Sequence, residues 1–476
     1  MPETTVAPVN PTEDKTTPET EAQSETSTEA AGDTNNMEKT NENDKNTDKS
    51  AEVKEDPPKE MRAVVLTGFI GSKTLKVLKK PEPTVNAGEV LIRVKACGVN
   101  FQDLMARQGA LISPPKTPFI MGFECAGEIV QVGEGVDDLK VGDNVLALPE
   151  FRAWAELVSV PRNLVYRLPD GMTHVQAVSI AMNFLVAHCV VHEMARVSPG
   201  QSVLLHSAGG AVGQAVAQLC KSIGDVTIYG VCSKNKHEAL KEGGLIDHLL
   251  DRSGDYPGEV RKLSPEGVDI VLDSLCGEEC NRGYALLKPL GKYVLFGASY
   301  AVQSIFNAVK SWWHVDKVSP TKLFEENKSL IGFNLHHLMF QQGGTAFVSK
   351  AMDKVFQLWK ENKIKPVVDS TWALEDIGEA MQKMYERKNV GKIIIDLSME
   401  PKPKPATPVK TKGKDKVKQT LSEDKKDDVK AEGEKADKAK IDVAENGVEK
   451  VEEKESQKPI INGGGEGDGE AKEVSS

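Results

Sequence analysis

Residues Gln201–Gly224 read QSVLLHSAGGAVGQAVAQLCKSIG, and this stretch decides the fold. An apolar run of strand length, Ser202–Ser207, leads into the glycine turn Ala208–Gly213, and small and apolar residues at helical spacing follow. A strand, a tight glycine turn and a helix start in this order form a phosphate cradle, because the backbone can approach an anion and free N–H groups point at it. The alternative is a packing turn that binds nothing.

The residues that follow alternate between strand and helix patterns. A second strand, Val226–Cys232, comes at the spacing of a βαβ unit, which strengthens the nucleotide-binding interpretation. Alternation of this kind predicts a doubly wound parallel sheet of the Rossmann type over residues 183–334. Its further strands are expected at Asp247–Leu250, Val268–Leu272, Lys292–Phe296 and Ser329–Phe333, and its helices at Lys236–Glu242, Tyr256–Leu263 and Glu279–Leu287.

The chain before Thr173 contains many short strands separated by Gly and Pro. This pattern predicts a compact, partly closed β domain over residues 61–182, with Val175–Val191 as a long helix leading into the cradle. Residues 335–399 are expected to fold back onto that domain and to make it discontinuous. The expected elements are strands at Arg62–Leu66, Glu89–Cys97, Gly127–Val132, Lys365–Val368 and Lys392–Leu397, and helices at Phe347–Asn362 and Ile377–Arg387.

Both ends of the chain are poor in large apolar residues. Residues 1–60 and 400–476 cannot bury enough surface to offset chain entropy, so both are predicted to be disordered tails. The formal net charge of −11 lies mostly in these tails, and the near-neutral remainder argues against a nucleic-acid-binding surface. Lys402–Lys418 is locally basic; it is either a solvated linker or a contact for anionic lipid or an acidic partner.

Seven scattered cysteines include no C-x-x-C pair. With no secretory signal pattern and no long apolar run evident, the sequence predicts a cytoplasmic protein of a reducing compartment. Any membrane association would then be peripheral.

Several motifs resemble a known family. They are KACGVNFQDLMARQG (95–109), GFECAG (122–127), HSAGGAVGQAVAQL (206–219) and NVGKIII (389–395). Together they resemble the zinc-free quinone oxidoreductase branch of the medium-chain dehydrogenase/reductase superfamily. The stretches SWW (311–313), LFEENKSLIGF (323–333) and KIKPVVDSTWALEDI (363–377) are most similar to the synaptic vesicle amine transport protein homologue and homologue-like proteins. The resemblance implies an α/β fold with a GroES-like catalytic domain and a Rossmann domain.

The resemblance also bears on metal. Zinc members of the superfamily place a Cys where this chain has Asn100 and a His where it has Phe123, and neither replacement is a zinc ligand. Cys97 and Cys125 lie nearby, but two isolated thiols do not make a tetrahedral site; the simpler interpretation is small core residues. We therefore expect no metal.

The cofactor expectation rests on the glycine turn and on the end of the second strand. The resemblance assigns the turn to cofactor binding through Ser207, Gly209, Gly210, Ala211, Val212 and Gly213. An NAD-preferring unit ends its second strand with Asp or Glu, whereas this chain continues with Ser233 and Lys234 and then Lys236. These groups suit a 2′-phosphate, so NADPH is expected, bound by Ser233 and Lys236, with Arg252 in the place of a family Tyr. The alternative for Lys234 and Lys236 is a solvated helical turn.

The resemblance implies further contacts near the nicotinamide ring. Asn100 and Asn183 are expected on one side, and the turn Asn389–Lys392 is expected to close over the phosphates. The remaining expected cofactor contacts are Asp273, Phe296, Gly297, Ser299 and Phe333. Asn100 is the one candidate catalytic residue, and its alternative is a turn-capping Asn. Asp103 and Arg107, one helical turn apart, are expected to form a structural ion pair.

Two functions remain open at this point. Leu111 stands where family members often carry a Tyr, and the sequence nominates no general acid. A quinone needs little acid catalysis, so the first hypothesis is an NADPH-dependent, zinc-independent reductase of quinones or conjugated carbonyls. The second is a catalytically weak NADPH-binding adaptor at vesicle or mitochondrial outer membranes.

No Walker motif supports ATP hydrolysis. The resemblance also implies a homodimer through an edge strand, for which Lys292–Phe296 is the candidate.

Overall fold

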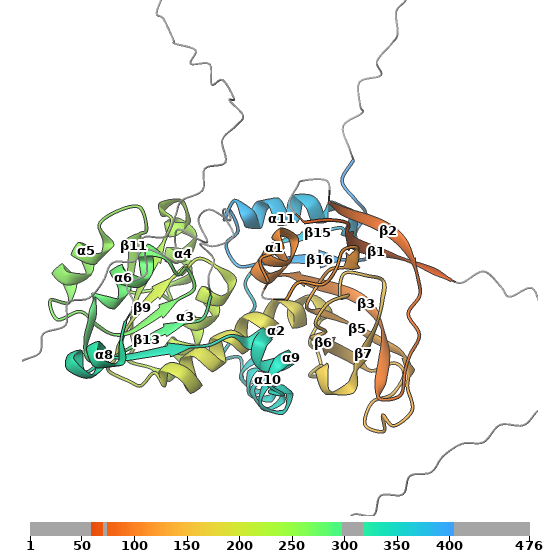
Figure 1. The fold of residues 1–476 in the computed structure, drawn as a ribbon, viewed down its shortest axis with the longest axis horizontal. Helices are drawn as coiled ribbons and strands as arrows, with labels where there is room; N and C mark the ends of the chain where they lie inside the picture. The colour runs from red at the N-terminus through yellow and green to blue at the C-terminus, as the bar shows by residue number, and fades with distance from the viewer. Residues whose placement is uncertain (1–58, 70–73, 112, 298–317, 404–476) are drawn as a thin grey trace, which may run out of the picture. The chain divides into compact units, whose positions relative to one another are not determined.

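The computed structural model describes residues 59–69, 74–111, 113–297 and 318–403 of the 476-residue chain (Figure 1). Three expectations lie outside these residues: the two tails apart from their inner ends, the site residue Ser299, and most of the segment around Trp312 and Trp313. The inner end of the C-terminal tail is described. Lys402 N donates to Asp376 Oδ2 at 3.1 Å, and its ammonium lies 3.6 Å from the centre of the Trp372 ring.

The quoted glycine stretch sits at the centre of a six-stranded parallel sheet with the order β11-β10-β9-β12-β13-β14. This is the doubly wound order expected when each strand is followed by a crossover helix. The strands are β9 Ser202–His206, β10 Thr227–Cys232, β11 His248–Asp251, β12 Val268–Asp273, β13 Leu287–Leu295 and β14 Ser329–Gly332. The helices are α3 Ala211–Ile223, α4 His237–Gly243, α5 Tyr256–Leu263, α6 Glu278–Tyr284 and α8 Pro320–Glu326.

The second part of the fold is built mainly from antiparallel strands. A seven-stranded sheet has the order β15-β16-β3-β5-β6-β8, with β7 paired to β3, and a three-stranded sheet has the order β2-β1-β4. The strands are β1 Glu60–Leu66, β2 Leu75–Pro81, β3 Glu89–Val99, β4 Phe119–Ile120, β5 Cys125–Val132, β6 Asn144–Ala147, β7 Leu157–Pro161 and β8 Val165–Arg167. Helix α1, Phe101–Gln108, follows β3 directly.

The C-terminal segment returns to this antiparallel sheet, as the sequence predicted. Strand β16, Lys392–Asp396, pairs antiparallel with β3 and parallel with β15, Val368–Trp372. Figure 1 shows the blue β16 beside the orange β3, although almost 300 positions separate them in sequence. Helices α9 Leu335–Gln341, α10 Thr345–Lys360 and α11 Ile377–Tyr385 complete the segment.

A long apolar helix carries the chain from one sheet to the other. Helix α2, His174–His188, continues as a π-helical segment, Cys189–Ala195. By length and composition His174–Ala195 could cross a membrane, which corrects the expectation that the chain has no long apolar run. An 18-residue window of this helix is 78% buried inside the protein, and a core helix of a soluble protein passes the same test, so the finding is weak evidence for a membrane span.

Three sequence predictions need correction. The strand expected at Lys365–Val368 lies at β15, Val368–Trp372, because the alternating residues after Val368 pair with β16. Strand β13, which contains the predicted edge Lys292–Phe296 up to Leu295, is covered by β14, so β14 is the outer strand. Helix α9 was not predicted; it begins at an Asn334 side chain that accepts a hydrogen bond from His337 N.

Candidate functional site

The glycine turn has the geometry that its sequence predicted. Ser207 has a φ of 58°, and α3 begins directly after Gly210, its N-cap residue. A Cβ added to Gly213 would lie 2.9 Å from Ala208 Cα and closer still to the Ser207 carbonyl oxygen. Only glycine therefore lets α3 approach the turn so closely.

The turn is bordered by Lys236 and by the C-terminal Asn389–Lys392 segment. The aliphatic part of Lys236 lies over Gly209, where an added Cβ would come within 2.8 Å of Lys236 Cδ. The Lys236 ammonium donates to the Asn389 carbonyl at 2.6 Å, and a parallel β-bridge joins Gly210 to Gly391. The turn that was expected to close over the cofactor thus lies against the glycine cradle.

Positive charge gathers at the end of β10. Lys236 is 8% exposed, and burial is the main reason why its pKa is lowered. The guanidinium groups of Arg252 and Arg387 also lower this pKa by repulsion, against the opposing effects of Cys232 and Asp369. A phosphate placed here would relieve the repulsion among three cations.

The ends of neighbouring strands bring several predicted residues together. Ser274 Oγ donates to Ser207 Oγ at 3.1 Å, and a Cβ added to Gly297 would lie 2.9 Å from the Ser274 carbonyl oxygen. Phe296 N donates to Asp273 O, and Phe333 N donates to Leu295 O, both at 2.9 Å. Ser207, Phe296, Gly297 and Phe333 therefore all lie at the C-terminal ends of β9, β13 and β14, where ligands bind in open α/β sheets.

The Asp273 side chain is engaged inside the protein. It is fully buried and accepts hydrogen bonds from His206 Nδ1 at 2.8 Å, Tyr293 Oη at 2.7 Å and Leu275 N at 2.7 Å. Burial alone would raise the pKa of this carboxyl, but the His206, Leu275 and Tyr293 contacts hold it below its usual range. This geometry does not support the expected cofactor contact through Asp273; the carboxylate instead ties β9, β12 and β13 together.

Asn100 belongs to a buried polar cluster that also contains Glu124 and Lys392. Lys392 Nζ donates to Asn100 Oδ1 at 2.6 Å and forms an ion pair with Glu124 Oε1, while Asn100 Nδ2 donates to Glu124 Oε1 at 2.8 Å. The Glu124 and Lys392 side chains are 0% and 1% exposed. The Lys392 ammonium therefore already has Asn100 and Glu124 as partners inside the β domain. This geometry does not support its expected contact with a cofactor phosphate.

The same cluster reaches α2 and the start of α1. Glu124 Oε2 accepts from Met182 N at 3.2 Å, so Asn183, the next residue, lies on the helix that adjoins the cluster. Asn183 is 4% exposed, and its amide donates to Ser179 O in the same helix at 3.1 Å. The structure thus brings the Asn100 and Asn183 regions together through Glu124.

Asp103 turns toward this cluster. It is fully buried, its Oδ2 accepts from Asn100 N at 2.7 Å, and no described residue hydrogen-bonds to its Oδ1. Burial raises the pKa of this carboxyl well above its usual range, although Asn100 N and Lys392 oppose the shift. The charged groups that act on the pKa of Asp103 are Lys392, which lowers it, and Glu124, which raises it.

The residues at the position of the superfamily's catalytic zinc do not fit a metal. Phe123 is 1% exposed and packs against Phe151 with ring centres 5.0 Å apart. Cys97 is fully buried and donates to Ala153 O, and burial raises the pKa of both Cys97 and Cys125. Protonated thiols are poor zinc ligands. Within the described ranges, no group of three or more His, Cys, Asp and Glu residues could hold a metal ion.

Comparisons with known proteins agree with this architecture. Residues 86–170 match the alcohol dehydrogenase GroES-like domain family, and residues 246–395 match the zinc-binding dehydrogenase family. The human synaptic vesicle membrane protein VAT-1 homolog-like is 49% identical over 348 residues, which is 72% of this chain and 83% of that protein. The chain belongs to the VAT-1 homologue family of medium-chain dehydrogenase/reductases.

Solved structures extend the comparison. The crystal structure of the human VAT-1 homolog-like protein has a TM-score of 0.64 at 46% identity and covers 72% of this chain and 99% of that one. A mycobacterial protein, Rv1454c, solved in complex with NADPH, has a TM-score of 0.63 at 28% identity and covers 71% and 99%. Membership of the family makes this VAT-1 homologue a member of an oxidoreductase superfamily.

Sequence reasoning missed Glu124 and His206 in this VAT-1 homologue. The available signal was a lone ionisable group inside an otherwise apolar segment: Glu124 in GFECAG, His206 at the end of SVLLH and Lys392 in GKIII. Such a group is rarely fully buried unless it has a partner. The sequence did not show which of these ionisable groups contact one another in the fold.

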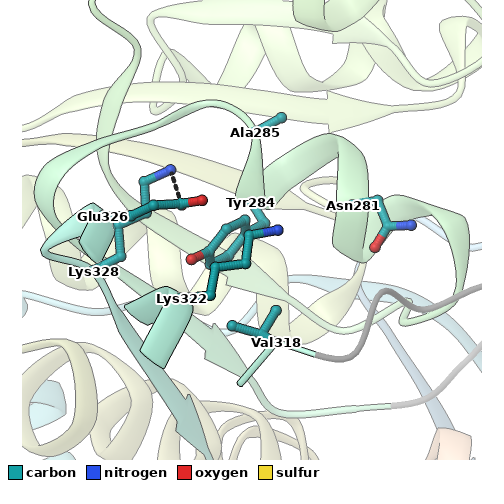
Figure 2. A pocket seen from close by; sticks show the side chains of 7 residues that line it. All are labelled: Asn281, Tyr284, Ala285, Val318, Lys322, Glu326 and Lys328. Carbon is teal, nitrogen blue, oxygen red and sulfur yellow. Dashed lines mark ion pairs between the residues drawn. The ribbon is translucent and has the colours of Figure 1, made fainter. Parts of the chain in front are cut away.

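A separate cavity of 210 Å³ lies beside α6 and α8 (Figure 2). The Lys322 and Lys328 ammonium groups lie 5.4 and 4.6 Å from the centre of the Tyr284 ring, and Lys328 pairs with Glu326 at 3.0 Å. None of its lining residues was predicted as a site residue. They are Asn281, Tyr284, Ala285, Val318, Lys322, Glu326 and Lys328.

Proposed function

We propose that this chain is an NADPH-dependent, zinc-independent reductase that transfers hydride to quinones or related conjugated carbonyl compounds. The observation that carries the proposal is the cluster of Lys236, Arg252 and Arg387 beside the glycine turn, at a strand end without a carboxylate. NADPH differs from NADH by a 2′-phosphate, which is the group that such a cluster recognises.

In this proposal the turn Ser207–Gly213 binds the pyrophosphate through its backbone, and Ser233, Lys236 and Arg252 bind the 2′-phosphate. The Lys236 ammonium now donates to a neutral acceptor, the Asn389 carbonyl. A phosphate oxygen would be a stronger, charged acceptor for the same group. Exchange of these partners would release the Asn389–Gly391 segment from Lys236 when the cofactor enters.

Asn183, Phe296, Gly297, Ser299 and Phe333 are proposed to surround the nicotinamide ring, from which the bound cofactor supplies the hydride. The amide of Asn100 is fixed in orientation, because Lys392 holds its oxygen and Glu124 holds its nitrogen. We assign Asn100 a positioning role next to the acceptor. Solvent can protonate the stabilised phenolate that a quinone forms, so no side-chain acid is required.

A second candidate function is an NADPH-binding adaptor with little turnover. It is favoured by the hydrogen bonds that both the oxygen and the nitrogen of the Asn100 amide make inside the protein, and by Leu111 where family members often carry Tyr. Under either function the ligand is a small molecule and not nucleic acid. We propose a cytoplasmic homodimer joined through the outer strand β14, with peripheral contact to vesicle or mitochondrial outer membranes in the adaptor case.

The decisive experiment compares NADPH and NADH binding to the full chain and to Lys236→Ala. Because a charge-assisted hydrogen bond contributes about 1.5–3 kcal/mol, Lys236→Ala is expected to weaken NADPH binding roughly 10- to 150-fold and to leave NADH binding nearly unchanged. Lys241→Ala is the matched control, since its ammonium pairs with Glu238 on the exposed face of the neighbouring helix.

Oxidation of NADPH is then followed with a panel of quinones and enones. Turnover supports the reductase, and tight NADPH binding without turnover supports the adaptor. The assignment of the 2′-phosphate site would be refuted if the chain bound NADPH and NADH with equal affinity and Lys236→Ala changed neither affinity.

A further inference from the structure

Two of the seven cysteines differ from the rest. Cys97, Cys125, Cys189, Cys220 and Cys232 are buried, whereas Cys276 and Cys280 are partly exposed. The latter two lie in the sequence DSLCGEEC, between the end of β12 and the first turn of α6.

The backbone at the first of these two cysteines has an unusual conformation. Cys276 has a φ of 63° and Gly277 has a φ of 71°, so two consecutive residues have a positive φ. A non-glycine residue rarely adopts this region without compensation. Here Cys276 N donates to Asp273 Oδ2 at 3.1 Å, and Cys280 Sγ lies 3.4 Å from the same oxygen, so both cysteines meet at one carboxylate.

The two thiols are chemically unequal. Cys280 Sγ donates to Asp273 Oδ2 at 3.4 Å. Interaction with the Cys280 thiol lowers the pKa of Cys276 to about 7 despite partial burial, and the same interaction raises the pKa of Cys280. By contrast, burial raises the pKa of Cys220 and of Cys189 to about 12. Cys276 is therefore the nucleophile of the pair. Cys280 is the resolving thiol, which attacks the oxidised Cys276 sulfur to form a disulfide.

We propose that Cys276 and Cys280 form a redox-active dithiol that hydrogen peroxide oxidises to an intrachain disulfide. In the first step the Cys276 thiolate attacks a peroxide oxygen; the S–O bond forms, the O–O bond breaks, and the departing oxygen leaves as water after taking a proton. In the second step Cys280 sulfur attacks the Cys276 sulfenic acid; the S–S bond forms, the S–O bond breaks, and hydroxide leaves as water with the Cys280 proton. Two thiols lose two electrons and one peroxide becomes two waters.

The position of the pair links it to the glycine turn. Ser274, two residues before Cys276, donates to Ser207 Oγ at 3.1 Å. The disulfide would close the loop Cys276–Cys280, which begins two residues after this contact. The redox proposal does not depend on the proposed cofactor or acceptor, because its readout is the oxidation state of two sulfurs.

Reactivity is expected to exceed that of an ordinary thiol. With a pKa of about 7 instead of 9.0, the thiolate fraction at pH 7 rises about 50-fold, while intrinsic nucleophilicity falls roughly tenfold. The net expectation is oxidation about five times faster than that of glutathione at the same peroxide concentration.

Trypsin provides a direct assay, because both cysteines fall in one peptide, Leu263–Arg282. The full chain is treated with hydrogen peroxide beside glutathione, alkylated with iodoacetamide under denaturing conditions and digested. The expected product is this peptide without alkyl groups and with two fewer hydrogens, restored by dithiothreitol, while the peptides of Cys189 and Cys220 remain alkylated.

Two variants separate the roles of the thiols. Cys280→Ser is expected to leave a Cys276 sulfenic acid that dimedone traps, and Cys276→Ser is expected to leave Cys280 free for alkylation. The proposal fails if the wild-type peptide carries two alkyl groups when half of the glutathione is oxidised. It also fails if Cys276 proceeds to sulfinic acid without a disulfide. The wild-type measurement decides this even where a variant does not fold.

Discussion

Replacing Lys392 with methionine tests the cluster that anchors Asn100. Lys392 and Glu124 are 1% and 0% exposed, and they form an ion pair with each other. Methionine keeps most of the side-chain length but removes the charge, so Glu124 would remain as a buried, uncompensated carboxylate with Asn100 Nδ2 and Met182 N as its remaining donors.

The expected cost follows from this burial. Removing one partner of a buried ion pair costs about 3–5 kcal/mol, because the remaining charge keeps its desolvation penalty. For roughly 340 folded residues with an unfolding entropy near 2.1 cal/mol/K each, this corresponds to a fall of about 4–7 °C in the melting temperature. Glu124→Gln combined with Lys392→Met removes both charges, so the double variant should recover a large part of the loss.

Thermal and urea unfolding of the wild type, the two single variants and the double variant give the coupling free energy. Lys241→Met is the matched control, because its ion pair with Glu238 has side-chain exposures of 63% and 87% and should not affect the midpoint measurably. The reasoning is refuted if Lys392→Met behaves like this control. It is also refuted if the double variant loses as much as the two single variants together.

Three further predictions concern the same region. Gly98→Ala should destabilise the fold by about 1–3 kcal/mol in urea unfolding, since an added Cβ would lie 2.7 Å from Lys392 Cε and closer still to the Glu124 carboxylate; a normal midpoint would contradict this packing. Asp103→Asn should flatten the pH dependence of stability. Burial raises the folded-state pKa of Asp103 above the unfolded 3.8, so its stabilising contribution is complete below that pH and is lost as the pH rises through the folded-state pKa; an unchanged profile would show that the pKa of Asp103 is the same in the folded and unfolded states. Dialysis against a chelator should leave the melting temperature and NADPH binding unchanged, and stoichiometric zinc in the purified protein would overturn the expectation of a metal-free site.

Local sequence patterns predicted most of the elements. The run from Ser202 to Gly224 became β9, the glycine turn and α3 with bounds close to those expected, because strand, turn and cap preferences act within a few residues. The strand at Lys365–Val368 was placed a few residues early, since the register of β15 is set by its pairing with β16. The outer strand of the parallel sheet was likewise misassigned, because strand order depends on pairing between distant segments.

For the site, motif reasoning selected segments that the fold brings together, but it did not anticipate which of their side chains are engaged inside the protein. Ser207, Phe296, Gly297 and Phe333 gather at strand ends, as expected of this fold. Asp273 and Lys392 were chosen for their charge and place in a motif. Both are instead satisfied inside the protein, by His206 and Tyr293 in one case and by Glu124 and Asn100 in the other.

The sequence by itself determined the family, the two kinds of sheet and the glycine turn, because these depend on periodicity and on residues within one supersecondary unit. Only the tertiary structure decided which ionisable groups meet. Glu124 and Lys392 are 268 positions apart, and β16 must pair with β3 before they come into contact. Charge in a buried place is stable only with a partner, and that partner is chosen by the fold rather than by neighbouring residues.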